Sequence, residues 1–319
     1  MSSPKKIIAV IGATGGQGGS VVKTLLADPK MSAEWAIRGI TRDASKESSQ
    51  KLASQGVEVV TGDLNSKDSM LAAFKGAYAV FAVTNYWEKM DYDLEVQQGK
   101  NLADAALESG VQHFIWSSLR NVTELTNGKL PNVYHFDSKA KVEEYIRTLS
   151  LPSTFFMPGF YMSNIPGQSL RPSPPNNAWT LSMPIPSSAP APLFSAFTDT
   201  GKFIKGILNN RSQTLGKRVL GATKYYTFDE VLDTFKKAYP EVGKEAQYFE
   251  VPHEMYKGFL TGMGMPDFAA VEVLENMRLL NEGGYYGGEE LEWSLSLVDE
   301  PLTTWEEFVK SAEAFKDFK

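Results

Sequence analysis

The sequence predicts an α/β fold, a doubly wound parallel sheet with a smaller C-terminal α/β lobe. Apolar strand patterns alternate with amphipathic helix patterns over the first half of the chain, and a glycine-rich segment directly follows the first strand pattern. Prolines are concentrated beyond residue 157. Alternating strands and helices form a parallel sheet covered on both faces, because right-handed crossovers place helices there.

The first strand is expected at 7–11, a β-branched run typical of a strand buried on both faces. In the helix expected next, Val21, Val22 and Leu25 share one face, and Pro29 lies where that helix should stop. Further strands are expected at 35–41, 57–61, 78–83, 114–117 and 153–157. Helices are expected between them at about 45–55, 66–74, 93–109 and 136–149. Ligands of such a sheet bind beyond the carboxyl ends of its strands.

The composition changes after residue 157. Nine of the 17 prolines fall between Pro158 and Pro192, a density that excludes regular helix and predicts a long loop or an extended excursion. Later helices are expected at 203–208, 228–238, 255–260 and 305–315. We therefore divide the chain into a first domain at 1–157 and a smaller lobe at 158–319, which closes over the ligand and forms a pocket. Interleaving of the two parts stays open.

Composition excludes several functions. The formal charge is −6, from 32 Lys and Arg against 38 Asp and Glu, which disfavours direct nucleic-acid binding. The absence of cysteine excludes disulfides and thiol nucleophiles, and His113, His135 and His253 lie too far apart in sequence to indicate a metal motif. No stretch approaches 18 apolar residues and no secretion signal is recognisable. We expect no membrane span and a cytoplasmic protein, with a nuclear location also open.

The glycine-rich segment is Gly12-Ala13-Thr14-Gly15-Gly16-Gln17-Gly18. Gly12 permits a tight turn, Gly15 lets backbone N–H groups approach a pyrophosphate, and Gly18 lets the helix pack close to the sheet. The helix amino terminus attracts the anion. A lone glycine motif is often only a turn, but here strand, glycines and helix follow in the required order. The sequence therefore predicts a NAD(P)-binding Rossmann domain at 1–157.

The residues after the second expected strand favour NADP(H) as the cofactor. An NAD site typically has a carboxylate there that binds the ribose hydroxyls. This chain instead has Arg42, 24 residues beyond Gly18. A guanidinium binds a 2′-phosphate through bidentate charged hydrogen bonds, and Lys46 supplies a second cation one turn onward. The neighbouring Asp43 leaves open the alternative that Arg42 is a solvated loop charge.

Polar groups also follow the third and fourth expected strands. Gly62-Asp63-Leu64 lies where this fold places the adenine ring. We expect Asp63 to accept a hydrogen bond from the adenine amine, with a cap on the next helix as the alternative. Thr84-Asn85-Tyr86-Trp87 lies close to the expected nicotinamide-side ribose, with an ordinary polar turn as the alternative.

These segments together resemble the NmrA-like family, atypical relatives of the short-chain dehydrogenase/reductases. The resemblance also rests on residues 95–106, 135–139, 142–145 and 158–162, and it spans nearly the whole chain. It implies NADP(H) binding, and the better known members are redox-responsive regulators. The cofactor contacts that it implies are Gly12 through Gly18, Arg42, Lys46, Asp63, Leu64, Thr84, Asn85, Tyr86, Lys139, Phe160, Tyr161 and Asn164. Some relatives have a further cofactor-contacting lysine at the position of Gln97, so that contact is not expected here.

The proton donor of short-chain reductases is displaced or missing. These enzymes use a tyrosine four residues before a lysine, because the two side chains then share one helical face and the ammonium lowers the phenol pKa. Four residues before Lys139 this chain has His135. The adjacent Tyr134 would lie about 100° around the helix. Ser117 and Ser118 follow the fifth expected strand, at the place of an accessory serine.

Two functions remain open. The missing tyrosine favours a non-catalytic NADP(H)-binding redox sensor that presents a cofactor-dependent surface to a regulatory protein partner. The alternative is an NADPH-dependent reductase of a small organic substrate, with Lys139 or His135 as the proton donor. A structural role for His135 is the further alternative.

Overall fold

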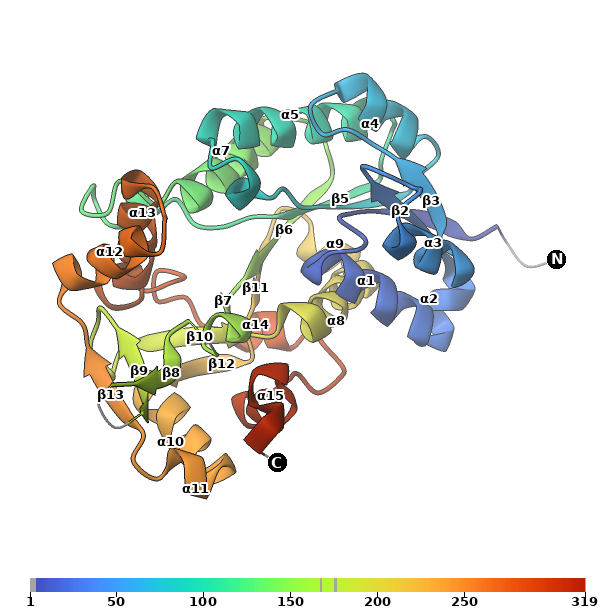
Figure 1. Ribbon diagram of the computed structural model, residues 1–319. Coiled ribbons are helices and arrows are strands. Elements are labelled where there is room, and N and C mark those ends of the chain that lie inside the picture. Colours follow the sequence, from blue (N-terminus) through green and yellow to red (C-terminus); the bar gives the residue numbers. More distant parts are fainter. Residues whose placement is uncertain (1–3, 167, 175–176, 319) are drawn as a thin grey trace.

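A parallel seven-stranded sheet forms the centre of the computed structural model, which describes residues 4–166, 168–174 and 177–318 (Figure 1). Its strands run in the order β11-β6-β5-β4-β1-β2-β3. Their bounds are β1 Lys6–Ile11, β2 Trp35–Thr41, β3 Glu58–Thr61, β4 Ala79–Ala82, β5 His113–Ser117, β6 Ser153–Pro158 and β11 Arg218–Gly221. The doubly wound prediction is confirmed. The order reverses between β1 and β4, so their carboxyl ends flank the crevice where such sheets bind ligands.

Helices cover both faces of this sheet. On one face lie α1 (Gly16–Ala27) and α8 (Ala196–Asn209), and on the other α4 (Lys67–Phe74), α5 (Tyr92–Glu108) and α7 (Tyr134–Thr148), as Figure 1 shows. Strand β1 is buried on both sides because Ile8 and Val10 pack into one apolar core while Ala9 and Ile11 pack into the other. The alternation of side chains along a strand therefore explains its continuous apolar run. Smaller helices are α2 (Pro29–Glu34), which starts at the proline just beyond α1, α3 (Glu47–Ser54), α6 (Val122–Leu125) and α9 (Arg211–Thr214).

The proline-dense segment is extended, as expected, and forms short strands. They are β7 (Phe160–Tyr161), β8 (Leu170–Ser173), β9 (Ala178–Met183) and β10 (Pro190–Phe194). With β12 (Lys224–Thr227) and β13 (Gln247–Glu250) they build two small sheets, ordered β12-β10-β7 and β13-β9-β8. Proline cannot donate to a sheet ladder, which keeps such strands short. A single 3₁₀ turn, η2 (Met162–Asn164), follows β7.

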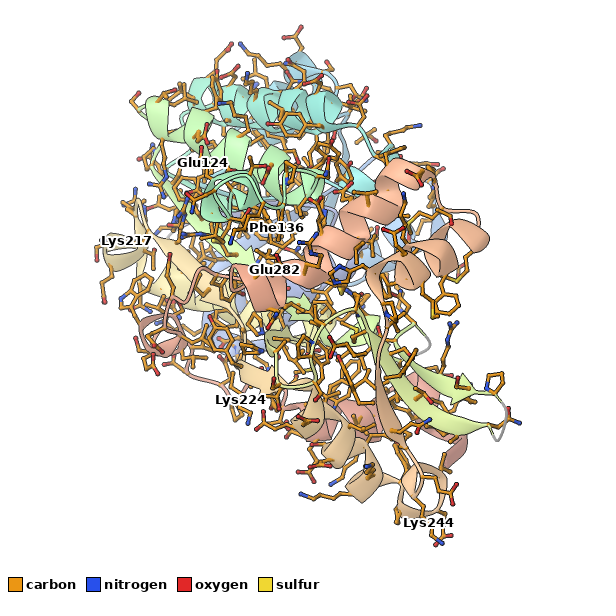
Figure 2. The ribbon with its side chains drawn as sticks, turned by 90° about the vertical axis from the view of Figure 1, so that its left-hand side faces the viewer. Glu124, Phe136, Lys217, Lys224, Lys244 and Glu282 are labelled. Atoms are coloured by element: carbon orange, nitrogen blue, oxygen red, sulfur yellow. The ribbon has the colours of Figure 1, made fainter. Side chains whose placement is uncertain are left out.

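The later helices surround the small sheets. They are α10 (Phe228–Ala238), α11 (Pro240–Gly243), α12 (His253–Gly262), α13 (Asp267–Glu282), α14 (Glu292–Leu295) and α15 (Trp305–Ser311), followed by η3 (Glu313–Phe318). Helix α10 lies where the sequence predicts it, whereas α13 was not predicted. Figure 2 shows Lys244, beside α11, at the opposite end of the molecule from Glu124 beside the α5 and α7 layer. Within the described ranges no helix is long and apolar enough to span a bilayer.

Residues 196–221 return to the large sheet. Helix α8 packs along α1, and β11 adds the last strand beside β6. The two helices touch closely because Gly201 has no side chain: a Cβ there would lie 2.2 Å from Thr24 Oγ1 and 2.3 Å from the Ser20 carbonyl. The polypeptide thus crosses from the large sheet to the small ones and back before it completes the small lobe.

Candidate functional site

The glycine loop has the geometry that its sequence pattern requires. Gly12 has φ of +64°, and its carbonyl accepts a hydrogen bond of 2.8 Å from the Gly15 N–H. A Cβ on Gly18 would lie 2.3 Å from the Gly12 carbonyl oxygen, so only glycine lets α1 start this close to the sheet. A Cβ on Gly15 would lie 3.3 Å from the same oxygen. Both glycines therefore serve the close packing of the loop, and the contact at Gly15 is the less severe of the two.

Arg42 directly follows β2 and forms an ion pair that the sequence did not predict. Its guanidinium binds the carboxylate of Glu88, the last residue of η1 (Tyr86–Glu88), and the two side chains are 72% and 39% exposed. Since β1 lies between β2 and β4 in the sheet, this pair spans the carboxyl end of β1. Exposed pairs contribute little to stability, so Arg42 is free to exchange Glu88 for a phosphate.

The other residues predicted for the adenosine half also lie beyond β2 and β3. Lys46 is exposed at the start of α3. Asp63 is exposed and accepts hydrogen bonds of 3.0 Å from the backbone and side-chain nitrogens of Asn65. Ser66 caps α4, so the alternative of Asp63 as the helix cap is wrong. The Leu64 carbonyl accepts a hydrogen bond of 2.9 Å from Asn101, which joins this loop to α5.

Gln17 connects the glycine loop to the ends of two other strands. Its side-chain oxygen accepts a hydrogen bond of 2.9 Å from Ser117 at the end of β5, and its nitrogen donates to the Tyr161 hydroxyl at 2.7 Å. Burial raises the pKa of Tyr161 to about 12, so this phenol stays protonated at neutral pH. Phe160 is buried beside it, and Asn164 is half-buried in η2. The predicted nicotinamide-side residues thus gather at the carboxyl ends of β1, β5 and β6.

A buried ion pair joins α7 to α5 behind this edge. Lys139 donates to the carboxylate of Glu95 and, at 3.3 Å, to the Thr84 hydroxyl. Thr84 and Ser138 also donate to Glu95, Thr84 at 2.7 Å. Burial disfavours the charged form of Glu95, but the Lys139 ammonium and these hydrogen bonds outweigh it and hold the Glu95 pKa below its usual value. Lys139 is therefore held beside the turn after β4.

His135 is paired with a carboxylate from the small lobe. Its Nδ1 lies 2.6 Å from an oxygen of Glu272 in α13, which also accepts the His135 backbone N–H at 2.8 Å. The Tyr86 hydroxyl donates to the second Glu272 oxygen at 2.8 Å. Burial, followed by the hydrogen bond to Glu272, raises the pKa of Tyr86. Predicted residues from the turn after β4 and from α7 are thus brought together by Glu272.

Helix α7 begins at Tyr134, so His135 and Lys139 both lie in the helix, four residues apart on one face. The Tyr134 hydroxyl donates to Asn132 at 3.0 Å, away from Lys139. Glu95 and Glu272 were not identified as site residues from the sequence. A carboxylate within an apolar helical run, as in Ala269-Ala270-Val271-Glu272-Val273, is the signal that could have indicated a buried partner.

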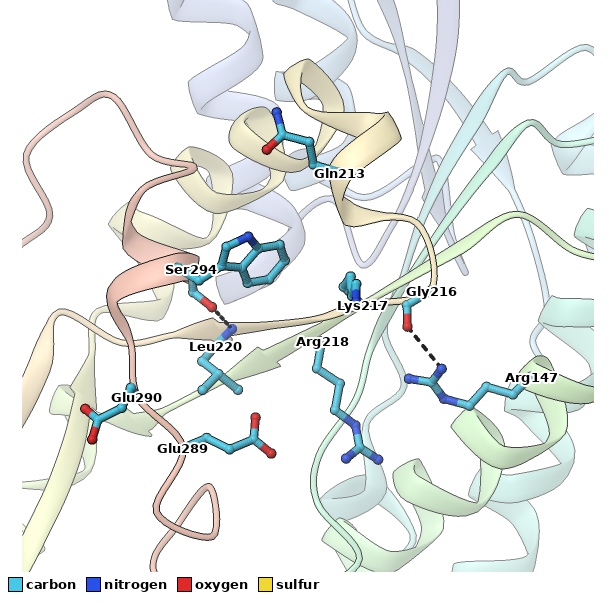
Figure 3. A pocket seen from close by; sticks show the side chains of 10 residues that line it. Arg147, Gln213, Gly216, Lys217, Arg218, Leu220, Glu289, Glu290 and Ser294 are labelled. Carbon is cyan, nitrogen blue, oxygen red and sulfur yellow. Dashed lines mark hydrogen bonds between the residues drawn. The ribbon is translucent and has the colours of Figure 1, made fainter.

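A hollow of about 710 Å³ lies along the edge strand β11 rather than at the carboxyl ends of β1 and β4 (Figure 3). There the Arg147 guanidinium donates to the Gly216 carbonyl at 3.1 Å, and the Leu220 N–H donates to Ser294 at 2.9 Å. None of the predicted cofactor residues is among those described as lining it. This hollow is therefore separate from the residues predicted to contact the cofactor.

Comparison with known proteins identifies relatives across almost the whole chain. A model described as the NmrA-like family matches residues 4–309. The chain is 31% identical over 307 residues to the NmrA-like family domain-containing oxidoreductase lnaB of Aspergillus flavus, covering 92% of this chain and 89% of lnaB. It is 31% identical over 301 residues to the NmrA-like family domain-containing oxidoreductase FrzB of Cladobotryum sp., covering 89% and 87% of the two chains.

Two solved structures share the fold. NmrA, a negative transcriptional regulator solved in complex with NADP, superposes with a TM-score of 0.79 at 22% identity, covering 97% of this chain and 95% of NmrA. The Citrobacter sp. triphenylmethane reductase complexed with NADP(H) superposes with a TM-score of 0.73 at 24% identity, covering 96% and 99% of the two chains. The Rossmann-type architecture predicted from the glycine loop is confirmed.

Proposed function

The chain belongs to the NmrA-like family, and on this premise we propose that it binds NADP(H) along the carboxyl edge of the large sheet and reduces a small organic substrate. The glycine loop supports the pyrophosphate site, because it joins β1 to the amino terminus of α1, where free backbone N–H groups attract an anion. Arg42 supports the choice of NADP(H), because its exposed guanidinium has only a weak surface partner to give up for a 2′-phosphate.

The pairing of His135 with Glu272 is the observation on which the reductase proposal rests. Reduction of a C=O, C=N or activated C=C bond adds a hydride, which NADPH supplies when bound, and a proton, which the protein must supply. The Nδ1 of His135 is bonded to Glu272 at 2.6 Å, so Nε2 is the nitrogen left to give a proton to a substrate. A buried carboxylate bonded to the far nitrogen of a histidine fixes the orientation of the ring.

Lys139 supports this arrangement from the next turn of α7. It lies four residues after His135, the spacing that the tyrosine and lysine of short-chain reductases use. Its bond to Glu95 and Thr84 anchors it where the nicotinamide-side ribose is expected. We infer that Lys139 orients the cofactor and that His135 is the proton donor. The oxidoreductase names of lnaB and FrzB agree with this proposal.

Absorbance of NADPH in the presence of quinones, enones, imines and aldehydes tests the proposal. We expect turnover with one of these classes and a fall in kcat of about a hundredfold or more in His135→Gln, the usual contribution of a general acid, with NADPH affinity retained. Tyr134→Phe is the matched control, since its hydroxyl bonds Asn132, and it should keep full activity. Full activity in His135→Gln would refute the assignment of the proton donor.

A redox sensor acting on a regulatory protein partner is the second candidate. It is favoured by the absence of a tyrosine four residues before Lys139 and by the engagement of the Lys139 ammonium with Glu95. A sensor must bind NADP⁺ and NADPH unequally, because a ligand with equal affinity for two conformations shifts neither. Unequal affinities, different proteolysis patterns of the two complexes and no turnover of any substrate class would favour the sensor over the reductase.

A further inference from the structure

An exposed aromatic ring lies directly on the glycine loop. Phe197, in the first turn of α8, is 63% exposed. A Cβ placed on Gly16 would lie 3.3 Å from two atoms of its ring, so the phenyl group is in contact with the glycine that starts α1. Among the exposed large apolar side chains described, it is the contact with the glycine loop that distinguishes Phe197. The exposed part of the ring is therefore open to a ligand bound on this loop.

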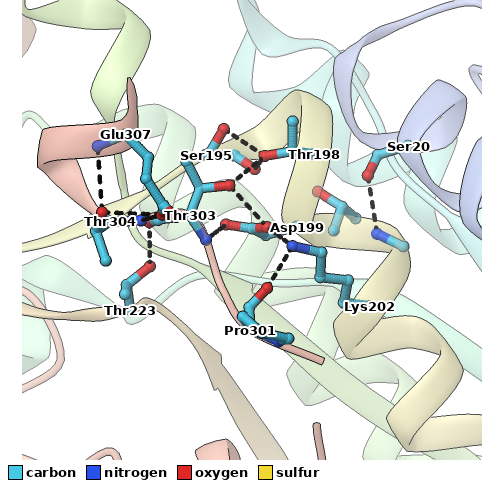
Figure 4. A network of polar contacts seen from close by, with 12 residues as sticks. Ser20, Ser195, Thr198, Asp199, Lys202, Thr223, Pro301, Thr303, Thr304 and Glu307 are labelled. Carbon is cyan, nitrogen blue, oxygen red and sulfur yellow. Dashed lines mark hydrogen bonds and ion pairs between the residues drawn. The ribbon is translucent and has the colours of Figure 1, made fainter. Parts of the chain in front are cut away.

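The ring is carried by a rigid support. A polar network ties the start of α8 to the chain near α15 (Figure 4). Asp199, fully buried, accepts hydrogen bonds of 2.9 Å and 3.1 Å from the backbone and side chain of Thr303, and it pairs with Lys202 at 2.7 Å. On the other side the Gly201 N–H donates to Ser20 of α1 at 3.0 Å. The backbone turn that carries Phe197 is thus held against α1.

The position of Phe197 indicates which half of the dinucleotide it would meet. Gln17, next to Gly16, bonds Ser117 and Tyr161 beyond β5 and β6. Phe194, three residues before Phe197, pairs with Tyr161 between β10 and β7. Arg42, on the adenosine side, directly follows β2 on the far side of β1. Phe197 therefore lies toward the nicotinamide half.

We propose that Phe197 is a cofactor-contacting residue that covers the nicotinamide-side phosphate and ribose of NADP(H) where they pass the start of α1. This inference rests on the proposed function, because it assumes that a dinucleotide binds to the glycine loop. The ring contributes apolar contact and keeps water from the charged groups beneath it. It makes no contact with the adenosine half, which is bound by the residues beyond β2 and β3.

A ligand that contains only the adenosine half of the cofactor distinguishes contacts with that half from contacts with the nicotinamide half. Calorimetric titration of wild type and Phe197→Ala with NADPH and with adenosine 2′,5′-bisphosphate tests the inference, because the second ligand has the adenosine and 2′-phosphate but no nicotinamide half. We expect NADPH to bind about fivefold to thirtyfold more weakly to Phe197→Ala, from partial loss of an aromatic contact, and the bisphosphate to bind equally to both proteins. Phe249→Ala, which removes another exposed ring from β13, should change neither affinity.

Unchanged NADPH affinity in Phe197→Ala overturns this inference alone, because the cofactor site itself is then intact. An equal loss for both ligands also overturns it, since the effect would then not belong to the nicotinamide half. A wild-type protein that binds neither ligand overturns the proposed function and this inference with it. Thermal unfolding of Phe197→Ala at the wild-type temperature would confirm that the variant is folded, as the exposure of the ring leads us to expect.

Discussion

Acid should destabilise this protein through one buried histidine, His113, the first residue of β5. It is fully buried, and its Nε2 lies 2.8 Å from the Thr154 hydroxyl. Thr154 donates its own proton to the Thr214 carbonyl at 3.0 Å, so it accepts from His113 and the neutral ring carries its proton on Nε2. Nδ1 is buried and has no hydrogen-bond partner within the described part of the chain. A second proton would therefore create a charge with nothing to stabilise it.

Burial, with a smaller effect of the Arg211 charge, lowers the pKa of His113 to about 3. In the unfolded chain the pKa is about 6.5, so below that pH the unfolded state binds the proton and the folded state does not. Stability from this residue is therefore complete above pH 6.5 and is lost as the pH falls toward 3. Integrating this linkage gives a loss of about 2 kcal/mol in the free energy of unfolding between pH 7.5 and pH 5.

Urea unfolding of wild type and His113→Gln at these two pH values measures the effect. The glutamine amide keeps a donor for Thr154 but does not titrate, so we expect the variant to lose about 2 kcal/mol less than wild type on acidification. Thr154→Ser keeps the hydroxyl and the histidine and should lose as much as wild type. Equal losses of unfolding free energy on acidification in wild type and His113→Gln would refute the reasoning, because groups other than His113 would then account for the whole effect.

Three further predictions concern Arg42 and the glycine loop. Arg42→Ala should weaken NADP binding by about tenfold to a hundredfold and leave NAD binding almost unchanged, since a charged hydrogen bond contributes about 1.5–3 kcal/mol. Calorimetric titration measures both affinities, and equal wild-type affinities for NADP and NAD would contradict the assignment. Gly18→Ala should lower the free energy of unfolding by about 1–3 kcal/mol, because backbone atoms 2.3 Å from the new Cβ must move. Gly15→Ala should stay folded in urea titrations but bind either dinucleotide weakly, and normal binding would place the pyrophosphate elsewhere.

Local patterns predicted the large sheet well because they reflect local causes. The expected strand at 35–41 and the expected helix at 228–238 coincide with β2 and α10, since side-chain periodicity depends only on neighbours along the chain. Helix α8 is longer than the expected 203–208. Its first turns bury Asp199, whose partner Thr303 lies 104 residues away, so its amino-terminal half does not show the apolar pattern of a buried helix.

Residue patterns along the chain were enough to predict the order of strands and helices in its first half. They also placed the glycine loop, Arg42 and Thr84 at the carboxyl edge of one sheet, since each follows a recognisable strand. The pairing of carboxylates with basic side chains depends instead on the packing of distant segments: His135 is joined to Glu272 across 137 residues of chain. Periodicity carries no information about such distant partners. Such pairs form when helices pack together, because a buried charge without a counter-charge within hydrogen-bond distance is costly.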